Sequence, residues 1–111
     1  MKQKLVQLLQ QRGSNMNSLE SYMLLAEYGM KMSDPDIATL AANGAILVSD
    51  GRDFRPYLVA AEVAEQVGDN KLATRRLRQA YAIAPNAGAV RNKVAEYGLA
   101  FEPTTGLPPG Q

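Results

Sequence analysis

The side chains that carry out most enzyme chemistry are missing from this sequence. Its 111 residues contain no His and no Cys, and 12 Lys and Arg balance 11 Asp and Glu to a formal net charge of +1. Thiolate and imidazole metal ligands, a cysteine nucleophile and a Ser-His-Asp triad are therefore all excluded. Catalysis would depend on carboxylates alone, so we expect a non-enzymatic protein with no cofactor and no bound metal.

The acidic residues show two patterns, and neither is catalytic. Glu27, Glu62 and Glu96 recur 35 and 34 residues apart in similar surroundings, which indicates a repeated structural or surface position. Nothing in their spacing pairs them as a general acid and base. Four aspartates lie where a helix cap or turn is wanted and lack the spacing of an EF-hand calcium loop: Asp34, Asp36, Asp50 and Asp53.

A basic cluster precedes Tyr81. Lys71, Arg75 and Arg78 share one helical face, with Arg76 beside them. Nucleic-acid binding would require a surplus of positive charge and several stacking aromatic residues. The near-neutral chain offers neither, so we expect a solvated face or a protein contact and consider nucleic acid unlikely as a partner.

The turn residues predict a chain of helices with no strand. Asp34-Pro35 is typical of a helix start, because aspartate caps the free N–H groups and proline needs none at the first helical position. The expected helices cover about 2–12, 18–29, 35–48, 54–67, 71–83 and 87–101. No apolar run reaches the roughly 20 residues that span a bilayer, and the first ten residues lack a signal-peptide pattern. These observations predict a cytoplasmic protein.

A short motif recurs at the length of one helix hairpin. Residues 25–30 (LAEYGM) return as residues 94–99 (VAEYGL), and residues 60–65 (AAEVAE) lie midway between them. Three evenly spaced copies indicate an internal repeat in which each unit is a pair of helices.

This period and the small residues within it resemble the tetratricopeptide repeat (TPR) family. The middle unit, residues 53–86, matches best: it has an aromatic residue at Tyr57, a Gly68-Asp69 turn and a closing Pro85-Asn86. The resemblance implies an antiparallel array of about six helices in a right-handed superhelical stack. It implies that the following residues pack the repeats together: Tyr22, Ala26, Tyr57, Ala61, Ala73, Leu77, Ala80, Pro85 and Ala95.

The expected organisation is a single domain followed by a tail. The domain, residues 1–101, divides into an N-terminal helix (1–13), a degenerate repeat (18–52), the best repeat (53–86) and a capping helix (87–101). Leu5, Leu8 and Leu9 of the N-terminal helix form either a cap or a partner-facing stripe. The tail, residues 102–111, is rich in Pro and Gly, and its composition favours disorder, although a strap or a docking arm is also compatible.

In the TPR family, the first helices of the units line a groove that holds a peptide or helix of another protein. The resemblance places these residues in it: Glu20, Met23, Leu24, Glu27, Arg55, Leu58, Val59, Glu62, Asn92, Lys93 and Glu96. In the best-known subclass, Lys, Asn and Arg at these places bind a C-terminal carboxylate, but here Leu58, Val59 and Glu62 occupy the middle of the surface. This set favours an amphipathic or basic helical ligand, unless the glutamates only keep the surface soluble.

The sequence therefore predicts a protein-protein interaction module that acts as an adaptor, assembly factor or small chaperone. The alternative is a structural subunit of a larger assembly that uses its N-terminal helix and Pro-rich tail as docking arms. Either role is compatible with an oligomer or with membership of a larger complex.

Overall fold

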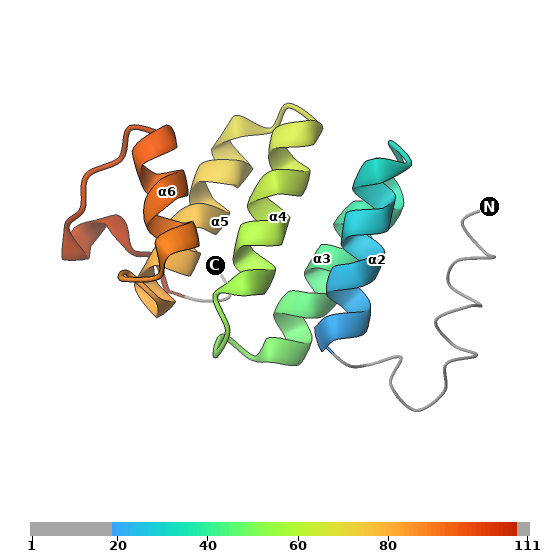
Figure 1. Ribbon diagram of the computed structural model, residues 1–111, viewed down its shortest axis with the longest axis horizontal. Helices are drawn as coiled ribbons and strands as arrows, with labels where there is room; N and C mark the ends of the chain where they lie inside the picture. Colours follow the sequence, from blue (N-terminus) through green and yellow to red (C-terminus); the bar gives the residue numbers. More distant parts are fainter. Residues whose placement is uncertain (1–18, 109–111) are drawn as a thin grey trace.

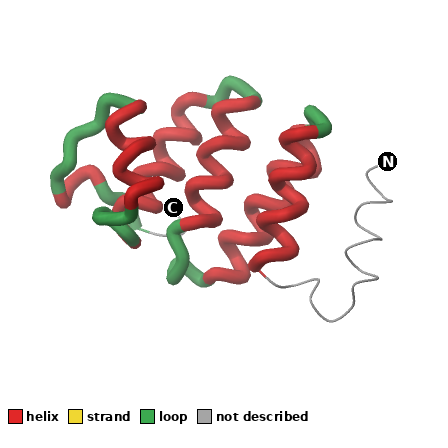
Figure 2. The backbone as a smooth tube through the Cα atoms, in the orientation of Figure 1, coloured by secondary structure: helices red, strands yellow, loops and turns green. Residues whose placement is uncertain are grey.

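The computed structural model describes residues 19–108, and this part of the chain is helical (Figure 1). The elements are α2 (Leu19–Lys31), α3 (Pro35–Ser49), α4 (Arg55–Gln66), α5 (Asn70–Ile83), α6 (Gly88–Glu96) and a 3-10 turn, η2 (Pro103–Thr105). Figure 2 shows helices and loops and no strand over these residues. The all-α class is confirmed. Five α-helices are present in the described range, and the predicted helix at 2–12 lies outside it.

The two hairpins turn in the same way. In each, a residue with positive φ, Ser33 (φ 53°) or Gly68 (φ 82°), precedes an aspartate that caps the next helix. Asp34 Oδ1 accepts a hydrogen bond from the Ile37 N–H at 3.3 Å, and Asp69 Oδ1 accepts one from the Leu72 N–H at 3.1 Å. The two aspartates also donate their own N–H groups to the carbonyl five residues back, at 2.8 and 2.9 Å. The predicted repeat of 35 residues is thus a repeat of backbone geometry between these two turns.

Small residues allow the helices to approach closely. One core cluster lies between α2, α3 and α4 and includes Ala26, Ala38 and Ala42. A second lies between α4, α5 and α6 around the fully buried Tyr57 and Leu77. At Gly29 a Cβ atom would lie 2.7 Å from the backbone nitrogen of Ala38, so α2 and α3 touch through their backbones there. Within residues 19–108, no helix has the length and apolar character needed to cross a bilayer.

Helix α6 ends earlier than predicted. We expected it to reach residue 101, but it stops at Glu96, and Gly98 then takes the left-handed conformation (φ 71°). The Leu99 N–H donates to the Val94 carbonyl at 3.0 Å, which closes the helix end. The Glu-Tyr-Gly of residues 96–98 therefore ends a helix, whereas the same tripeptide at 27–29 lies inside α2.

The described part of the tail, residues 102–108, is bonded to the helical domain, as in the strap that the sequence left open, and we call it the C-terminal strap. The strap lies along α5. The Leu107 N–H donates to the Arg78 carbonyl at 3.0 Å, and Arg78 Nε donates to the Thr105 carbonyl at 2.9 Å. Gln79, fully buried, donates through Nε2 to the Pro108 carbonyl at 3.2 Å. Backbone acceptors of the Pro-rich segment are satisfied by α5 side chains.

Candidate partner-binding face

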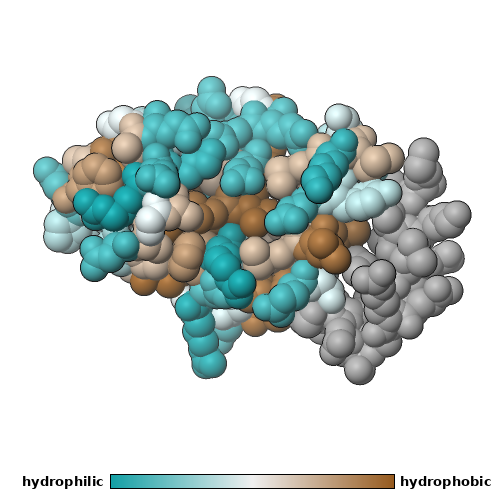
Figure 3. Space-filling model, in the orientation of Figure 1, coloured by the Kyte–Doolittle hydropathy of each residue, from teal (hydrophilic) through white to brown (hydrophobic). Residues whose placement is uncertain are grey.

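The helices α2, α4 and α6 present one common face, which we call the first-helix face. In Figure 1 they lie in front of α3 and α5. Seven of the residues predicted to line a groove are exposed: Glu20, Leu24, Glu27, Arg55, Glu62, Asn92 and Glu96. Met23, Leu58 and Lys93 are half-buried. Figure 3 shows hydrophobic surface between hydrophilic side chains across the middle of this view.

Val59 does not lie on this face. Its side chain is 8% exposed and belongs to the core cluster between α2, α3 and α4. The exposed stripe of α4 instead continues from Leu58 through Glu62 to Glu65, at intervals of four and three residues. Glu65, which the family resemblance does not assign to the face, is half-buried and forms an ion pair with Lys93. The i, i+4, i+7 spacing of Leu58, Glu62 and Glu65 is the sequence signal that places Glu65 on this face.

Three carboxylates, from α4 and α6, act on one ammonium group, and a fourth, Glu27 on α2, acts on Glu62. Lys93 Nζ on α6 lies 3.1 Å from Glu65 Oε2 and 3.6 Å from Glu96 Oε2. The pKa of Glu62 is raised, first by burial and then by the negative charges of Glu65, Glu27 and Glu96, while Lys93 opposes the shift. We call Glu27, Glu62, Glu65 and Glu96 the carboxylate cluster. The negative charge of these four carboxylates exceeds the single positive charge of Lys93.

Lys93 is held within this cluster. Burial alone would lower the pKa of its ammonium group, but the hydrogen bond to Glu65 and the charges of three glutamates raise it overall. The ammonium also lies 5.9 Å from the centre of the Tyr97 ring. Burial, followed by the proximity of Glu65, raises the pKa of the Tyr97 hydroxyl. Lys93 therefore stays charged and ties α6 to α4.

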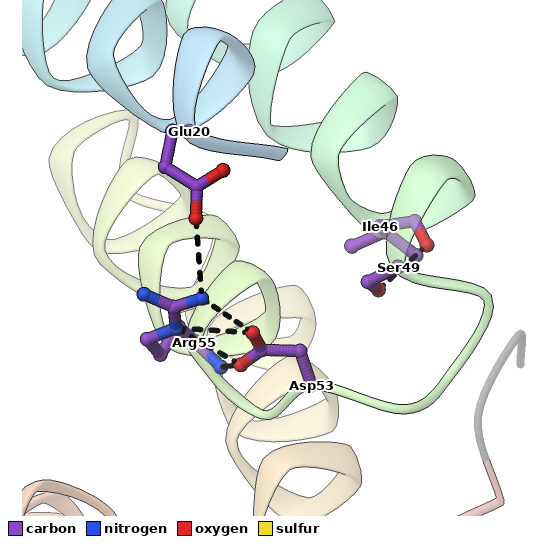
Figure 4. Close-up of polar contacts among 5 residues, drawn as sticks. All are labelled: Glu20, Ile46, Ser49, Asp53 and Arg55. Atoms are coloured by element: carbon purple, nitrogen blue, oxygen red, sulfur yellow. Dashed lines mark hydrogen bonds and ion pairs between the residues drawn. The ribbon is translucent and has the colours of Figure 1, made fainter. Parts of the chain in front are cut away.

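At the opposite end of the face, one guanidinium lies between two carboxylates (Figure 4). The Arg55 guanidinium lies 2.6 Å from Asp53 Oδ2 and 3.7 Å from Glu20 Oε1, so it links α4 to the start of α2. This guanidinium lowers the pKa of Asp53. The predicted cap is slightly displaced: Asp53 accepts the Arg55 N–H at 2.9 Å, although Phe54 is the N-cap residue. Arg55 thus has carboxylate partners within its own chain.

The predicted packing residues divide into two groups. Ala26, Tyr57, Ala61, Ala73, Leu77 and Ala80 are buried, and Tyr22 is half-buried with its ring against Gly44. Pro85 and Ala95 are exposed, which corrects the expectation for both. Pro85 lies in the turn before α6, and Ala95 lies in the last turn of α6, where no helix follows within the described residues to pack on it.

The basic residues of α5 lie around a hollow beside the strap. Lys71, Arg75 and Arg78 line a hollow of about 430 Å³ together with Thr74 and Leu107. Because Arg78 already bonds the Thr105 carbonyl, part of this basic face serves an internal contact.

Comparison with protein-family models, with curated proteins and with solved structures gave no match for this chain. In residues 19–108, no group of three or more Asp and Glu side chains is arranged to hold a metal ion.

Proposed function

We propose that the chain forms a short TPR-like stack with right-handed twist and acts without catalysis as an adaptor, assembly factor or small chaperone. Its binding surface in this proposal is the first-helix face, and its ligand is a helical segment of a partner protein. The repeated turns at Ser33-Asp34 and Gly68-Asp69 support the stacked-repeat reading, because each places a capped second helix at the same point of its hairpin.

The observation that carries the proposal is the carboxylate cluster. Three helices contribute carboxylates that act on Glu62, and one ammonium group among them leaves an excess of negative charge. Leu24 and the half-buried Met23 and Leu58 supply apolar contact surface on the same face. A helix with basic residues beside an apolar stripe complements both features, since it satisfies the carboxylates and buries apolar area.

The alternative role, a structural subunit with docking arms, has less support. The strap is bonded to α5 through Arg78, Gln79 and Leu107 and therefore already has a partner in its own chain. A tail held in this way would need to be released before it could reach another protein.

Two synthetic peptides test the proposed ligand. Each has about 20 residues, long enough for substantial helicity, and the same leucine stripe. One carries Lys beside the stripe, and the other carries Glu at the same positions. We expect fluorescence anisotropy to detect binding of the Lys peptide only, with affinity falling as salt is raised. Equal binding of both peptides, or of neither, would refute the ligand class.

Variants then locate the site. Glu62→Gln is expected to weaken binding by about 2- to 5-fold, the effect of losing one partly exposed charge contact. Leu24→Glu, at a side chain that is 53% exposed, should abolish binding without unfolding the protein. The matched controls are Glu102→Gln on the strap and Val48→Glu on α3, both at exposed positions off the face. Controls that weaken binding as much as the site variants would place the ligand elsewhere.

A further inference from the structure

An apolar surface is exposed on the outer side of the first hairpin. Tyr28 of α2 and Met32, which follows the end of that helix, are 43% and 47% exposed, and Leu40 and Leu47 of α3 are 68% and 79% exposed. We call these four residues the end face. Large apolar side chains grouped in this way on two adjacent helices usually mark a contact surface.

Helix geometry places the end face opposite α4. Its three helical residues, Tyr28, Leu40 and Leu47, each lie two positions from a buried residue, which is about 160° around the helix. Tyr28 is two residues from the buried Ala26, and Leu40 and Leu47 are two residues from the buried Ala42 and Ala45. Because α4 packs against the inward side of both helices, the end face points away from the stack.

The second hairpin, formed by α4 and α5, is covered on both sides, whereas the first hairpin is covered on one side only. Helices α4 and α5 have α3 on one side and α6 with the strap on the other. In residues 19–108 no element covers the outer side of α2 and α3. Repeat stacks need a cap at each end to shield the core from water.

We propose that residues 5–12 of the same chain cover the end face as an amphipathic helix. The eighteen residues before Leu19 lead directly into α2, and Leu5, Leu8 and Leu9 fall on one helical stripe. The connecting residues 13–18 can span up to about 20 Å. This equals the length of α2, whose 13 residues extend about 20 Å. The segment can therefore reach any point along the hairpin.

The short linker, residues 13–18, also favours residues 5–12 over a second copy of the chain as the segment that covers the end face. A segment tethered by a short linker is present at an effective concentration in the millimolar range. A second protein molecule at micromolar concentration competes poorly with it for the same apolar surface. The assignment does not rest on the proposed function, although Leu24 of the first-helix face lies one helical turn before Tyr28 on α2.

Engineered cysteine pairs test the assignment cleanly, because the natural chain has no Cys. The full-length double variant Leu8→Cys with Tyr28→Cys is oxidised at low micromolar concentration, and disulfide formation is followed by loss of free thiols and by non-reducing electrophoresis. We expect a monomeric cross-linked species that forms about tenfold faster than in the control pair, Leu8→Cys with Lys71→Cys. Lys71 is exposed on α5, away from the end face.

Two results would overturn the proposal. A cross-linking rate no greater than that of the control pair would mean that the segment does not dock there. A disulfide-linked dimer whose yield rises with protein concentration would assign the end face to a second copy.

Hydrogen exchange gives a second, independent readout. Leu8→Ser combined with Leu9→Ser should increase amide exchange in α2 and α3 by more than Gln10→Ser, which alters the segment away from its leucine stripe. Equal exchange in these variants would also contradict the proposal.

Discussion

Replacing Glu62 by Gln should stabilise the fold while it weakens binding of the basic peptide. The ionised carboxylate of Glu62 is partly buried and is repelled by Glu65, Glu27 and Glu96, with one opposing attraction from Lys93. Exposed charge pairs are worth about 0.3 to 0.5 kcal/mol each. Burial is the largest contribution, and the attraction to Lys93 exceeds each single repulsion, so for this partly exposed side chain we expect a net gain of up to about 1 kcal/mol at pH 7. The midpoint of thermal unfolding should rise by up to about 5 °C.

The pH dependence gives this prediction a defined sign. The pKa of Glu62 is raised in the folded protein above its ordinary value of 4.5. The folded state therefore binds this proton more tightly than the unfolded state, and the ionised form destabilises the fold. The penalty is fully present above the raised pKa, and it disappears as the pH falls through that value to below about 4.5. The stabilisation by Glu62→Gln should vanish over the same range.

Urea unfolding followed by circular dichroism at pH 7 and pH 4 measures this effect, with Glu102→Gln as the control. The control glutamate is exposed on the strap and lies outside the carboxylate cluster. If Glu62→Gln lowers the free energy of unfolding at pH 7, or changes it equally at both pH values, the electrostatic account of the cluster is wrong.

Three further predictions concern stability. Gly29→Ala should lower the free energy of unfolding by about 1 to 3 kcal/mol, because its methyl group would meet the backbone of α3. Gly44→Ala should lower it by less, because its methyl group would meet the half-buried ring of Tyr22, which can turn. Equal losses in the two variants would contradict this distinction. Asp69→Ala should cost about 1 kcal/mol through loss of the N-cap, with Asp69→Asn nearly neutral, both measured by urea unfolding. Gln79→Ala should speed hydrogen exchange at the Leu107 amide without unfolding α5, and unchanged exchange would show that Gln79 does not hold the strap.

The parts of the fold that could be predicted from sequence are those set by local chemistry. Asp34-Pro35 fixed the start of α3, because the cap and the proline act within one turn of the helix. Gly68-Asp69 marked the start of α5 to within a residue for the same reason. Capping depends on a side-chain oxygen and a backbone N–H three residues apart, so no knowledge of the tertiary structure is needed.

The end of α6 could not be predicted in this way, since one tripeptide has two conformations. At residues 27–29, Gly29 packs against the backbone of Ala38, and this contact holds the glycine inside α2. At residues 96–98, no atom lies within 4 Å of the position where a Gly98 Cβ would be, and the glycine takes a left-handed conformation that ends α6. The packing of the following helix in the hairpin decides between the two outcomes, and in the described range no α-helix follows α6.

The candidate site shows a similar division. The 35-residue spacing identified Glu27, Glu62 and Glu96, and the charges of Glu27 and Glu96 do act on Glu62. The family resemblance assigned Val59 to the face, but the helical period from Leu58 selects Glu65. Which stripe of α4 is buried depends on how α2 and α3 pack against it, and a motif spacing does not contain that information.

The strap could not be predicted because its partner is a buried polar residue. On α5 the inward stripe runs through Ala73, Leu77 and Ala80, and Gln79 lies on a different side of the helix. Sequence patterning therefore assigns Gln79 to solvent, yet the strap buries it completely and accepts its hydrogen bond. Composition describes a Pro-rich tail as disordered, because it takes no account of such a specific acceptor. If residues 5–12 cover the end face as proposed, that face and the strap-covered side of α5 both serve contacts within the chain, which favours the first-helix face for a partner.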